Sequence, residues 1–91
     1  MTKDLLLSIK SKLDDLYTSY YIALRTKDGR RREKNIREAR QAISDYSQTI
    51  PNEVMDIFHR EVGANALNYQ HADDIPECLR ILDKMIYEHD R

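Results

Sequence analysis

The densest group of residues that could carry chemistry is a basic segment at residues 25–40. It holds eight Lys and Arg residues against three acids, a local net charge of +5. On a helix, spacings of four and then three residues place Arg30, Lys34 and Arg37 on one face. Such a face can contact the phosphates of a nucleic acid or the carboxylates of an acidic protein. The candidate binding residues are Arg30, Arg31, Arg32, Lys34, Arg37 and Arg40.

The same segment also fits an ordinary solvated helix face. Glu33 lies four residues before Arg37, which is the spacing of surface ion pairs along a helix. Lys34 and Glu38 have the same spacing. The whole chain has a net charge of −1, whereas a dedicated nucleic-acid-binding domain usually has a basic surplus. Three interpretations stay open: a solvated or intramolecular face, a site for an acidic protein and, ranked third, a nucleic-acid site.

The other reactive residues form no recognisable catalytic or metal-binding motif. Cys78 is the only cysteine and lies in an apolar helical pattern, which favours buried packing over nucleophilic catalysis. Asp56 and His59 stand one helical turn apart, but a di-iron bundle needs a matching pair on another helix, and none occurs. No glycine-rich phosphate loop, hydrolase motif or zinc-protease motif is present. We therefore predict a non-catalytic protein without a cofactor or metal.

Composition favours one small helical domain. The chain has 91 residues, only two Gly and two Pro, and 34% charged residues, which suits long helices with solvated faces. A chain of this size builds one modest core and often completes it by self-association, so a homodimer is a serious alternative to a monomer. Acids near the start interrupt the apolar run that a signal peptide needs, and no segment is apolar enough to span a bilayer. These features predict a cytoplasmic protein outside the membrane.

The longest amphipathic pattern runs from Leu5 to Leu24 and predicts a helix over residues 3–26. Thr2 is expected to cap this helix, with Asp4 favourably placed in its first turn. Most of its apolar residues fall on one stripe, which needs to be covered by the elements that follow. Three apolar residues lie off the stripe and are predicted to form a partner-facing surface: Leu7, Tyr21 and Ile22.

A second helix is predicted over residues 31–48, where Ile36 and Ile43 mark the apolar stripe. Its small residues Ala39 and Ala42 would let it approach the first helix closely. The intervening turn contains Gly29, for which we expect a left-handed conformation at the end of the first helix. A short turn between two long helices makes them antiparallel neighbours.

The second half of the chain predicts two further helices. Pro51 suits the first turn of a helix over residues 51–62, which either stops at Gly63 or continues to residue 69. The last helix is predicted over residues 74–89, with Asp73 or Asp74 as its cap and Pro76 in its first turn.

Together these patterns predict an all-α protein with a single domain over residues 1–91. The fold is a small antiparallel helical bundle, in which a long αα-hairpin precedes one or two shorter helices and a C-terminal helix. The function that fits is a protein–protein interaction or regulatory module, comparable in size and helicity alone with immunity, antitoxin or adaptor proteins. Its partner would be another protein or a second copy. The alternative is a nucleic-acid-associated accessory protein that uses the basic face of residues 30–40.

Overall fold

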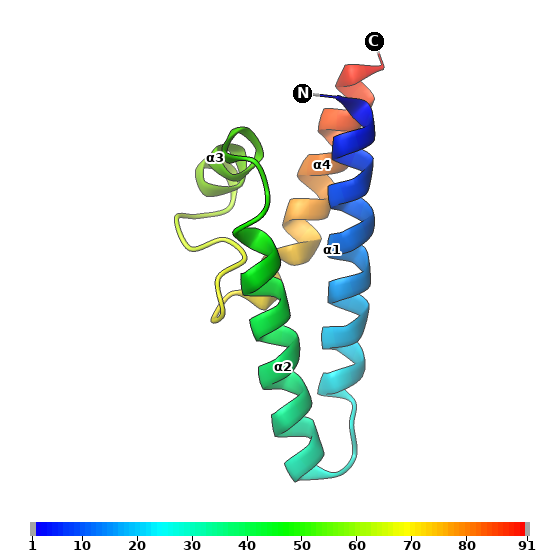
Figure 1. Ribbon diagram of the computed structural model, residues 1–91, viewed down its shortest axis with the longest axis vertical. Helices are drawn as coiled ribbons and strands as arrows, with labels where there is room; N and C mark the ends of the chain where they lie inside the picture. The colour runs from blue at the N-terminus through cyan, green and yellow to red at the C-terminus, as the bar shows by residue number, and fades with distance from the viewer. Residues whose placement is uncertain (1, 91) are drawn as a thin grey trace.

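The computed structural model describes residues 2–90, and these form an elongated all-α bundle of 47 × 22 × 18 Å (Figure 1). This confirms the predicted fold class. The elements in chain order are α1 (Lys3–Leu24), α2 (Gly29–Ser47), α3 (Asn52–Glu61), a 3₁₀ turn η1 (Ala72–Asp74) and α4 (Ile75–His89). None of the helices described is long and apolar enough to cross a bilayer.

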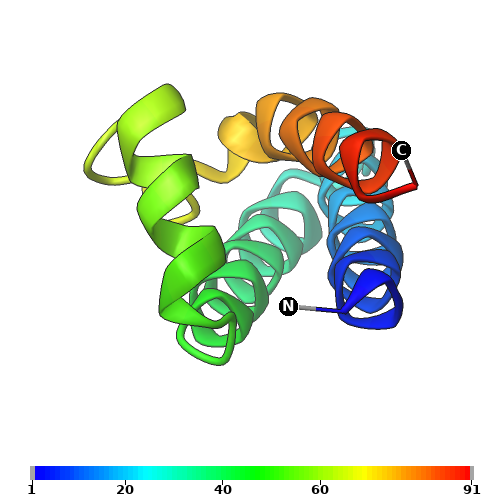
Figure 2. The same ribbon diagram turned by 90° about the horizontal axis from the view of Figure 1, so that it is seen from above.

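Helix α1 is the central element of the bundle, because it packs against both α2 and α4 (Figures 1 and 2). Two ion pairs join α1 to α4: Lys3 Nζ lies 2.8 Å from Asp90 Oδ1, and Lys10 pairs with Asp83. Both pairs fit antiparallel helices in one register. Helix α4 runs beside the first half of α1 only (Figure 1). The second half of α1 and the first half of α2 extend beyond α4, and we call this part the far half of the hairpin.

The turn between α1 and α2 is set by Asp28. Its carboxylate accepts hydrogen bonds from the backbone N–H groups of Arg30 (2.9 Å) and Arg31 (3.2 Å), the N-cap arrangement that starts a helix. Gly29 is therefore the first residue of α2 and does not adopt the left-handed conformation that we expected for it. Helix α1 ends at Leu24, two residues before the predicted end. At its other end, Thr2 caps α1 as predicted, by accepting from the Leu5 N–H at 3.2 Å.

Helix α3 stops at Glu61, which resolves the two alternatives for the segment after Gly63. Gly63 has a φ of 154°, a conformation that residues with a side chain rarely adopt, so the helix ends here and the chain reverses. Residues 64–71 then return to α4 without forming a helix. Within this connection Leu67 is fully buried.

The start of α4 differs from the predicted cap. Pro76 lies in its first turn as predicted, but no side chain caps the helix, and the chain enters it through η1. The Asp74 carboxylate instead lies 3.6 Å from Nδ1 of His71. A 3₁₀ entry uses backbone hydrogen bonds in place of the expected side-chain cap.

The hydrophobic core lies where all four helices meet, around the first half of α1. Its largest fully buried side chains come from every helix and from the 64–71 connection: Phe58, Leu13, Ile43, Leu67, Ile75 and Leu82. The far half of the hairpin is thinner, and the buried residues there are Tyr20, Ala23 and Ala39. It is thus a two-helix projection from a four-helix body (Figure 1).

Candidate interaction surface at the hairpin tip

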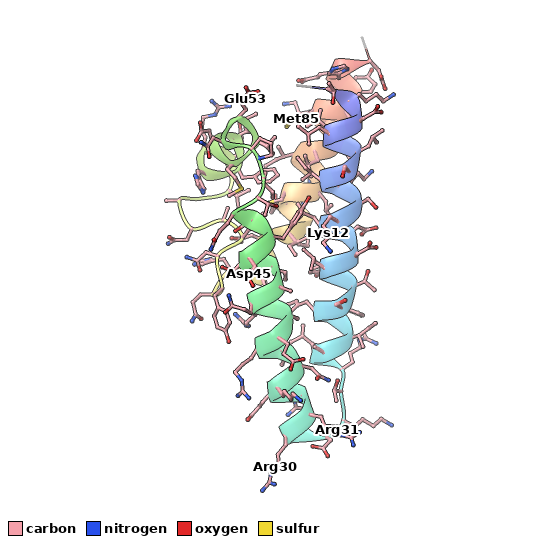
Figure 3. The ribbon with its side chains drawn as sticks, viewed as in Figure 1. Lys12, Arg30, Arg31, Asp45, Glu53 and Met85 are labelled. Atoms are coloured by element: carbon pink, nitrogen blue, oxygen red, sulfur yellow. The ribbon has the colours of Figure 1, made fainter. Side chains whose placement is uncertain are left out.

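The end of the hairpin carries a cluster of exposed cations, which we call the basic tip. It comprises Lys27, Arg30, Arg31, Arg32, Lys34 and Arg37. Figure 3 shows Arg30 and Arg31 at the end of the molecule farthest from α3 and from the chain termini. The hairpin fold therefore brings five of the six predicted basic candidates together, with Lys27 added from the turn.

Three arginines of the basic tip lie at the positive end of the α2 helix dipole, where cations are disfavoured. Arg30, Arg31 and Arg32 follow Gly29 in the first turn of α2, which is the positive end of the helix dipole even though Asp28 caps it. No acidic residue stands in that turn, which lies between the N-cap Asp28 and Glu33 in the chain. Since cations are disfavoured at a helix N-terminus, an anion bound there would relieve their repulsion.

Ion pairing within the chain leaves most of the basic tip free. Lys34 Nζ lies 3.9 Å from Glu38 Oε1, which is one of the two surface pairs that the spacing predicts. The other predicted pair, Glu33 with Arg37, is not formed. Within residues 2–90, the side chains of Arg30, Arg31 and Arg32 have no hydrogen-bond or ion-pair partner. These three guanidinium groups are therefore available to carboxylates or phosphates from another molecule.

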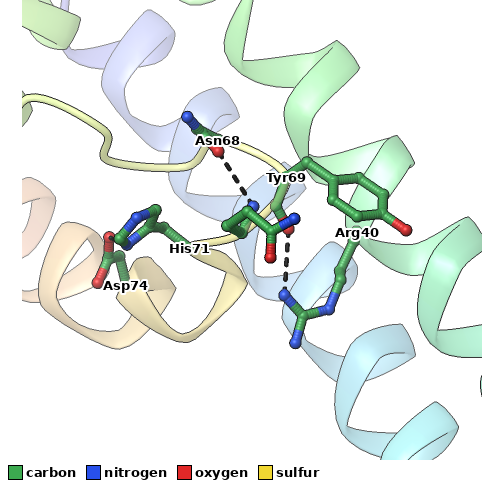
Figure 4. Close-up of polar contacts among 6 residues, drawn as sticks. Arg40, Asn68, Tyr69, His71 and Asp74 are labelled. Atoms are coloured by element: carbon green, nitrogen blue, oxygen red, sulfur yellow. Dashed lines mark hydrogen bonds and ion pairs between the residues drawn. The ribbon is translucent and has the colours of Figure 1, made fainter.

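Arg40, the sixth predicted candidate, lies apart from the basic tip. Its guanidinium group donates to the backbone carbonyl of Tyr69 at 3.2 Å (Figure 4), and it also donates to the hydroxyl of Tyr20 at 3.2 Å. It also lies 5.5 Å from the centre of the Tyr20 ring, within the range of a cation–π contact. Arg40 thus joins α1 and α2 to the 64–71 connection. Next to it, the Asn68 side chain accepts from the Gln70 N–H at 3.0 Å and keeps this connection turned.

The three apolar candidates do not form one surface. Leu7 is 42% exposed in the first half of α1, whereas Tyr21 and Ile22 lie near its other end, roughly 20 Å farther along the axis. The Tyr21 ring is covered by Arg25, whose guanidinium carbon lies 4.4 Å from the ring centre. Ile22 is 62% exposed and is the most accessible of the three.

Ile22 borders a shallow groove of about 370 Å³ between α1 and α2 that sequence reasoning missed. Small and apolar residues dominate its lining: Leu16, Ser19, Ile22, Ala23, Ala39 and Ala42. The alanines of α2 signal a close helix approach, but periodicity does not show that Ala42 stays exposed at the edge of that contact.

Cys78 is buried, and the described metal-ligating side chains do not gather into a site. Burial raises the pKa of the Cys78 thiol to about 12, with smaller contributions from Asp74 and Glu77, so at neutral pH it is protonated and unreactive. Within residues 2–90, no group of three or more His, Cys, Asp and Glu side chains could hold a metal ion.

Comparisons of the chain with models of known protein families, with curated proteins and with solved structures find no match, so its function is argued from its own residues.

Proposed function

We propose that this chain is a non-catalytic protein-interaction module whose basic tip binds an acidic surface of another protein. The observation that carries this proposal is the group of three exposed arginines, Arg30, Arg31 and Arg32, placed without acidic partners in the first turn of α2. Such an arrangement is unfavourable for the isolated helix and favourable once carboxylates approach. Binding sites often hold residues that lower the stability of the free protein.

A protein partner suits the charge of the whole molecule. The basic tip is strongly positive, but residues 41–91 carry ten acids against four bases, a net charge of −6. A nucleic acid would be repelled by this acidic part unless it approached only the end of the hairpin. A carboxylate-bearing patch on a protein can be small enough to meet the tip alone, and arginine binds carboxylates with two parallel hydrogen bonds.

The proposal is tested by capturing partners with the wild-type chain and with the triple variant Arg30→Glu, Arg31→Glu, Arg32→Glu. Bound proteins from the native cells are identified by mass spectrometry after immobilisation of equal amounts of each chain. We expect at least one protein with an acidic surface to be retained by the wild type and lost by the variant. Glutamate in the first turn of α2 favours the helix, so loss of folding would not explain the loss of binding.

A matched control removes the same number of positive charges elsewhere. Arg60, Arg80 and Lys84 are exposed on α3 and α4, far from the tip, and their triple Glu variant should retain the same proteins as the wild type. The proposal is contradicted when both triple variants lose the partner equally, because the interaction would then depend on total charge. It also fails when the tip variant retains every protein that the wild type retains.

One observation favours nucleic acid as a second candidate. Arg30, Lys34 and Arg37 are all exposed and follow one ridge along α2, as the spacing predicts, and this ridge could follow a phosphate backbone. The two functions differ in salt dependence. Binding to duplex DNA should weaken by about one unit of log affinity per phosphate contact for each tenfold rise in salt, and the tip variant should lower that slope. No detectable retention of DNA or RNA at low salt would eliminate this alternative.

A further inference from the structure

The α1–α2 hairpin has an open face, which is the side that points away from α4. Figure 2 shows α4 against one side of the α1–α2 layer and no helix over the opposite side. Along α1, alternating spacings of three and four residues define one exposed stripe on this face. This stripe is distinct from the apolar stripe of α1 that faces the core. It consists of Leu5, Ser8, Lys12, Asp15, Ser19 and Ile22.

The stripe is complementary to itself when a second copy runs in the opposite direction. Apolar residues then face apolar residues at its ends, serines face serines, and a lysine faces an aspartate near the middle. All of these pairs are centred on the peptide bond between Leu13 and Asp14, so a single two-fold axis produces every one of them twice. The pairs are Leu5 with Ile22, Ser8 with Ser19, and Lys12 with Asp15.

The two charged residues of the stripe are free to form such pairs. Lys12 and Asp15 are exposed, and neither takes part in an ion pair or side-chain hydrogen bond within the described part of the chain. They stand three residues apart on the same helix and still do not pair with each other. Across an antiparallel contact, each lysine would meet the aspartate of the other copy.

The groove provides the place for the apolar end of the second copy. In the register set by the three pairs, Leu5 of the second copy lies beside Ile22, over the groove between α1 and α2. Leu5 is 36% exposed and Ile22 is 62% exposed, so both have apolar surface to bury. The small side chains of Ser19, Ala39 and Ala42 leave room for a leucine at this point.

The charge distribution of the molecule favours the antiparallel orientation. A parallel dimer would bring together two segments of residues 25–40, each with a charge of +5. An antiparallel dimer instead places each basic end near the acidic end of the other copy. That end holds Asp4 in the first turn of α1 and Glu53 in the first turn of α3, the latter labelled in Figure 3. Opposite charges at both ends favour this pairing over the parallel one.

We propose that two copies of this chain associate through the open face, with their α1 helices antiparallel about a two-fold axis at the Leu13–Asp14 peptide bond. The outer ridge of α2, with Arg30, Lys34 and Arg37, stays exposed in this arrangement. The dimer therefore presents one basic tip at each end. This inference does not depend on what the tips bind, because the oligomeric state can be measured without a partner.

The test exchanges the central charges and measures the molar mass by sedimentation equilibrium. The wild type should dimerise, with twice the 10.8 kDa mass of one chain. The single variants Lys12→Asp and Asp15→Lys each place like charges across the axis and should weaken dimerisation at least tenfold. An equimolar mixture of the two single variants should dimerise again, because each copy now supplies the charge that the other needs. The double variant should also recover.

The apolar ends have a matched control on the same helix. Leu5→Asp should prevent dimerisation, whereas Leu7→Asp should leave it unchanged, because Leu7 is slightly more exposed than Leu5 but lies off the stripe. A wild type that stays monomeric at the highest soluble concentration overturns the proposal. Single charge variants that dimerise as well as the wild type, or a mixture that stays monomeric, also overturn it.

Disulfide formation tests the register independently. A mixture of the Ser8→Cys and Ser19→Cys chains should form a cross-linked heterodimer on mild oxidation, because these positions face each other. Each variant alone should cross-link slowly, since identical positions lie roughly 16 Å apart along the axis. The native Cys78 is fully buried and should not interfere. Equal cross-linking by the separate variants and by the mixture would contradict the proposed register.

Discussion

Arg40 joins three segments that are far apart in the chain. Tyr20 precedes it by 20 residues and Tyr69 follows it by 29, and both accept hydrogen bonds from its guanidinium group. Sequence reasoning groups Arg40 with the basic face, because its neighbours in the chain are basic. Its contacts depend on where the 64–71 connection returns to the hairpin, and no local spacing reveals that. Charge content was therefore predictable from the sequence, but the division between packing and exposed arginines was not.

We expect the Arg40→Met variant to lower the free energy of unfolding by about 1–2 kcal/mol, because it keeps the apolar stem but loses two hydrogen bonds and the cation–π contact. Urea denaturation followed by circular dichroism measures this change. Arg37→Met is the matched control, since Arg37 is exposed on the same helix and its loss should change stability by less than about 0.5 kcal/mol. Equal effects at both positions would contradict the packing role of Arg40.

The buried Cys78 thiol should make stability depend on alkaline pH. Burial raises its pKa from an ordinary 9.0 to about 12, so the folded state keeps a proton that the unfolded state releases. The stabilising contribution is complete below pH 9.0 and is lost as the pH rises towards about 12. The urea midpoint should fall across this window, and Cys78→Ala should fall less steeply. Burial also raises the pKa values of Tyr20 and Tyr46, so some decline should remain.

The first turn of α2 combines a favourable cap with unfavourable charges. Asp28 accepts from two N–H groups, while Arg30, Arg31 and Arg32 add positive charge to the positive end of the helix. We expect the single variant Arg30→Glu to raise the free energy of unfolding by about 0.5 kcal/mol. Asp28→Ala should lower it by about 1 kcal/mol. Thermal unfolding at low salt measures both, and a destabilising Arg30→Glu would contradict the electrostatic argument.

Substitution by alanine should change the free energy of unfolding in opposite directions at the two glycines. Gly63 has a φ of 154°, so Gly63→Ala should lower the free energy of unfolding by about 1–2 kcal/mol, although the space around it is open. Gly29 lies in the first turn of α2 with nothing near an added methyl group. Gly29→Ala should therefore raise the free energy by about 0.5–1 kcal/mol. Chemical denaturation of the two variants checks both signs.

The helices themselves could be predicted because their apolar residues recur with a helical period. The bounds of α2 and α4 differ from the predicted ones by at most two residues. The ends of the helices were harder to predict, because they depend on which capping hydrogen bonds form. At the first turn, Gly29 suggested the end of a helix, but the side-chain hydrogen bonds of Asp28 make Gly29 the first residue of α2. At α4, the 3₁₀ turn replaces a side-chain cap that Asp74 could have supplied.

The charge of the molecule changes sign along its long axis. The basic tip lies at one end of a 47 Å body, and most of the acidic residues belong to the part near the other end (Figure 1). The sequence revealed this charge separation but not the groove or the open face, because both depend on which side of α1 is covered by α4. A two-fold dimer through that face would carry a tip at each end, and so could bridge two partner molecules.

We expect such a dimer to bind two partner molecules. Light scattering of the purified complex should give two chains and two partners, because the tips lie at opposite ends. The Lys12→Asp variant, which weakens dimerisation, should bind one partner per chain with an unchanged intrinsic affinity. A complex of two chains with a single partner would contradict the separation of the two surfaces.

We propose that the basic tip recognises carboxylates on a protein. The most direct test is the dissociation constant of a purified captured partner for three chains at low salt: the wild type, the Arg30→Glu, Arg31→Glu, Arg32→Glu variant, and the Arg60→Glu, Arg80→Glu, Lys84→Glu control. We predict that the tip variant binds at least tenfold more weakly, while the control stays within about twofold of the wild type. Equal dissociation constants for the tip variant and the wild type would contradict recognition of carboxylates by the basic tip.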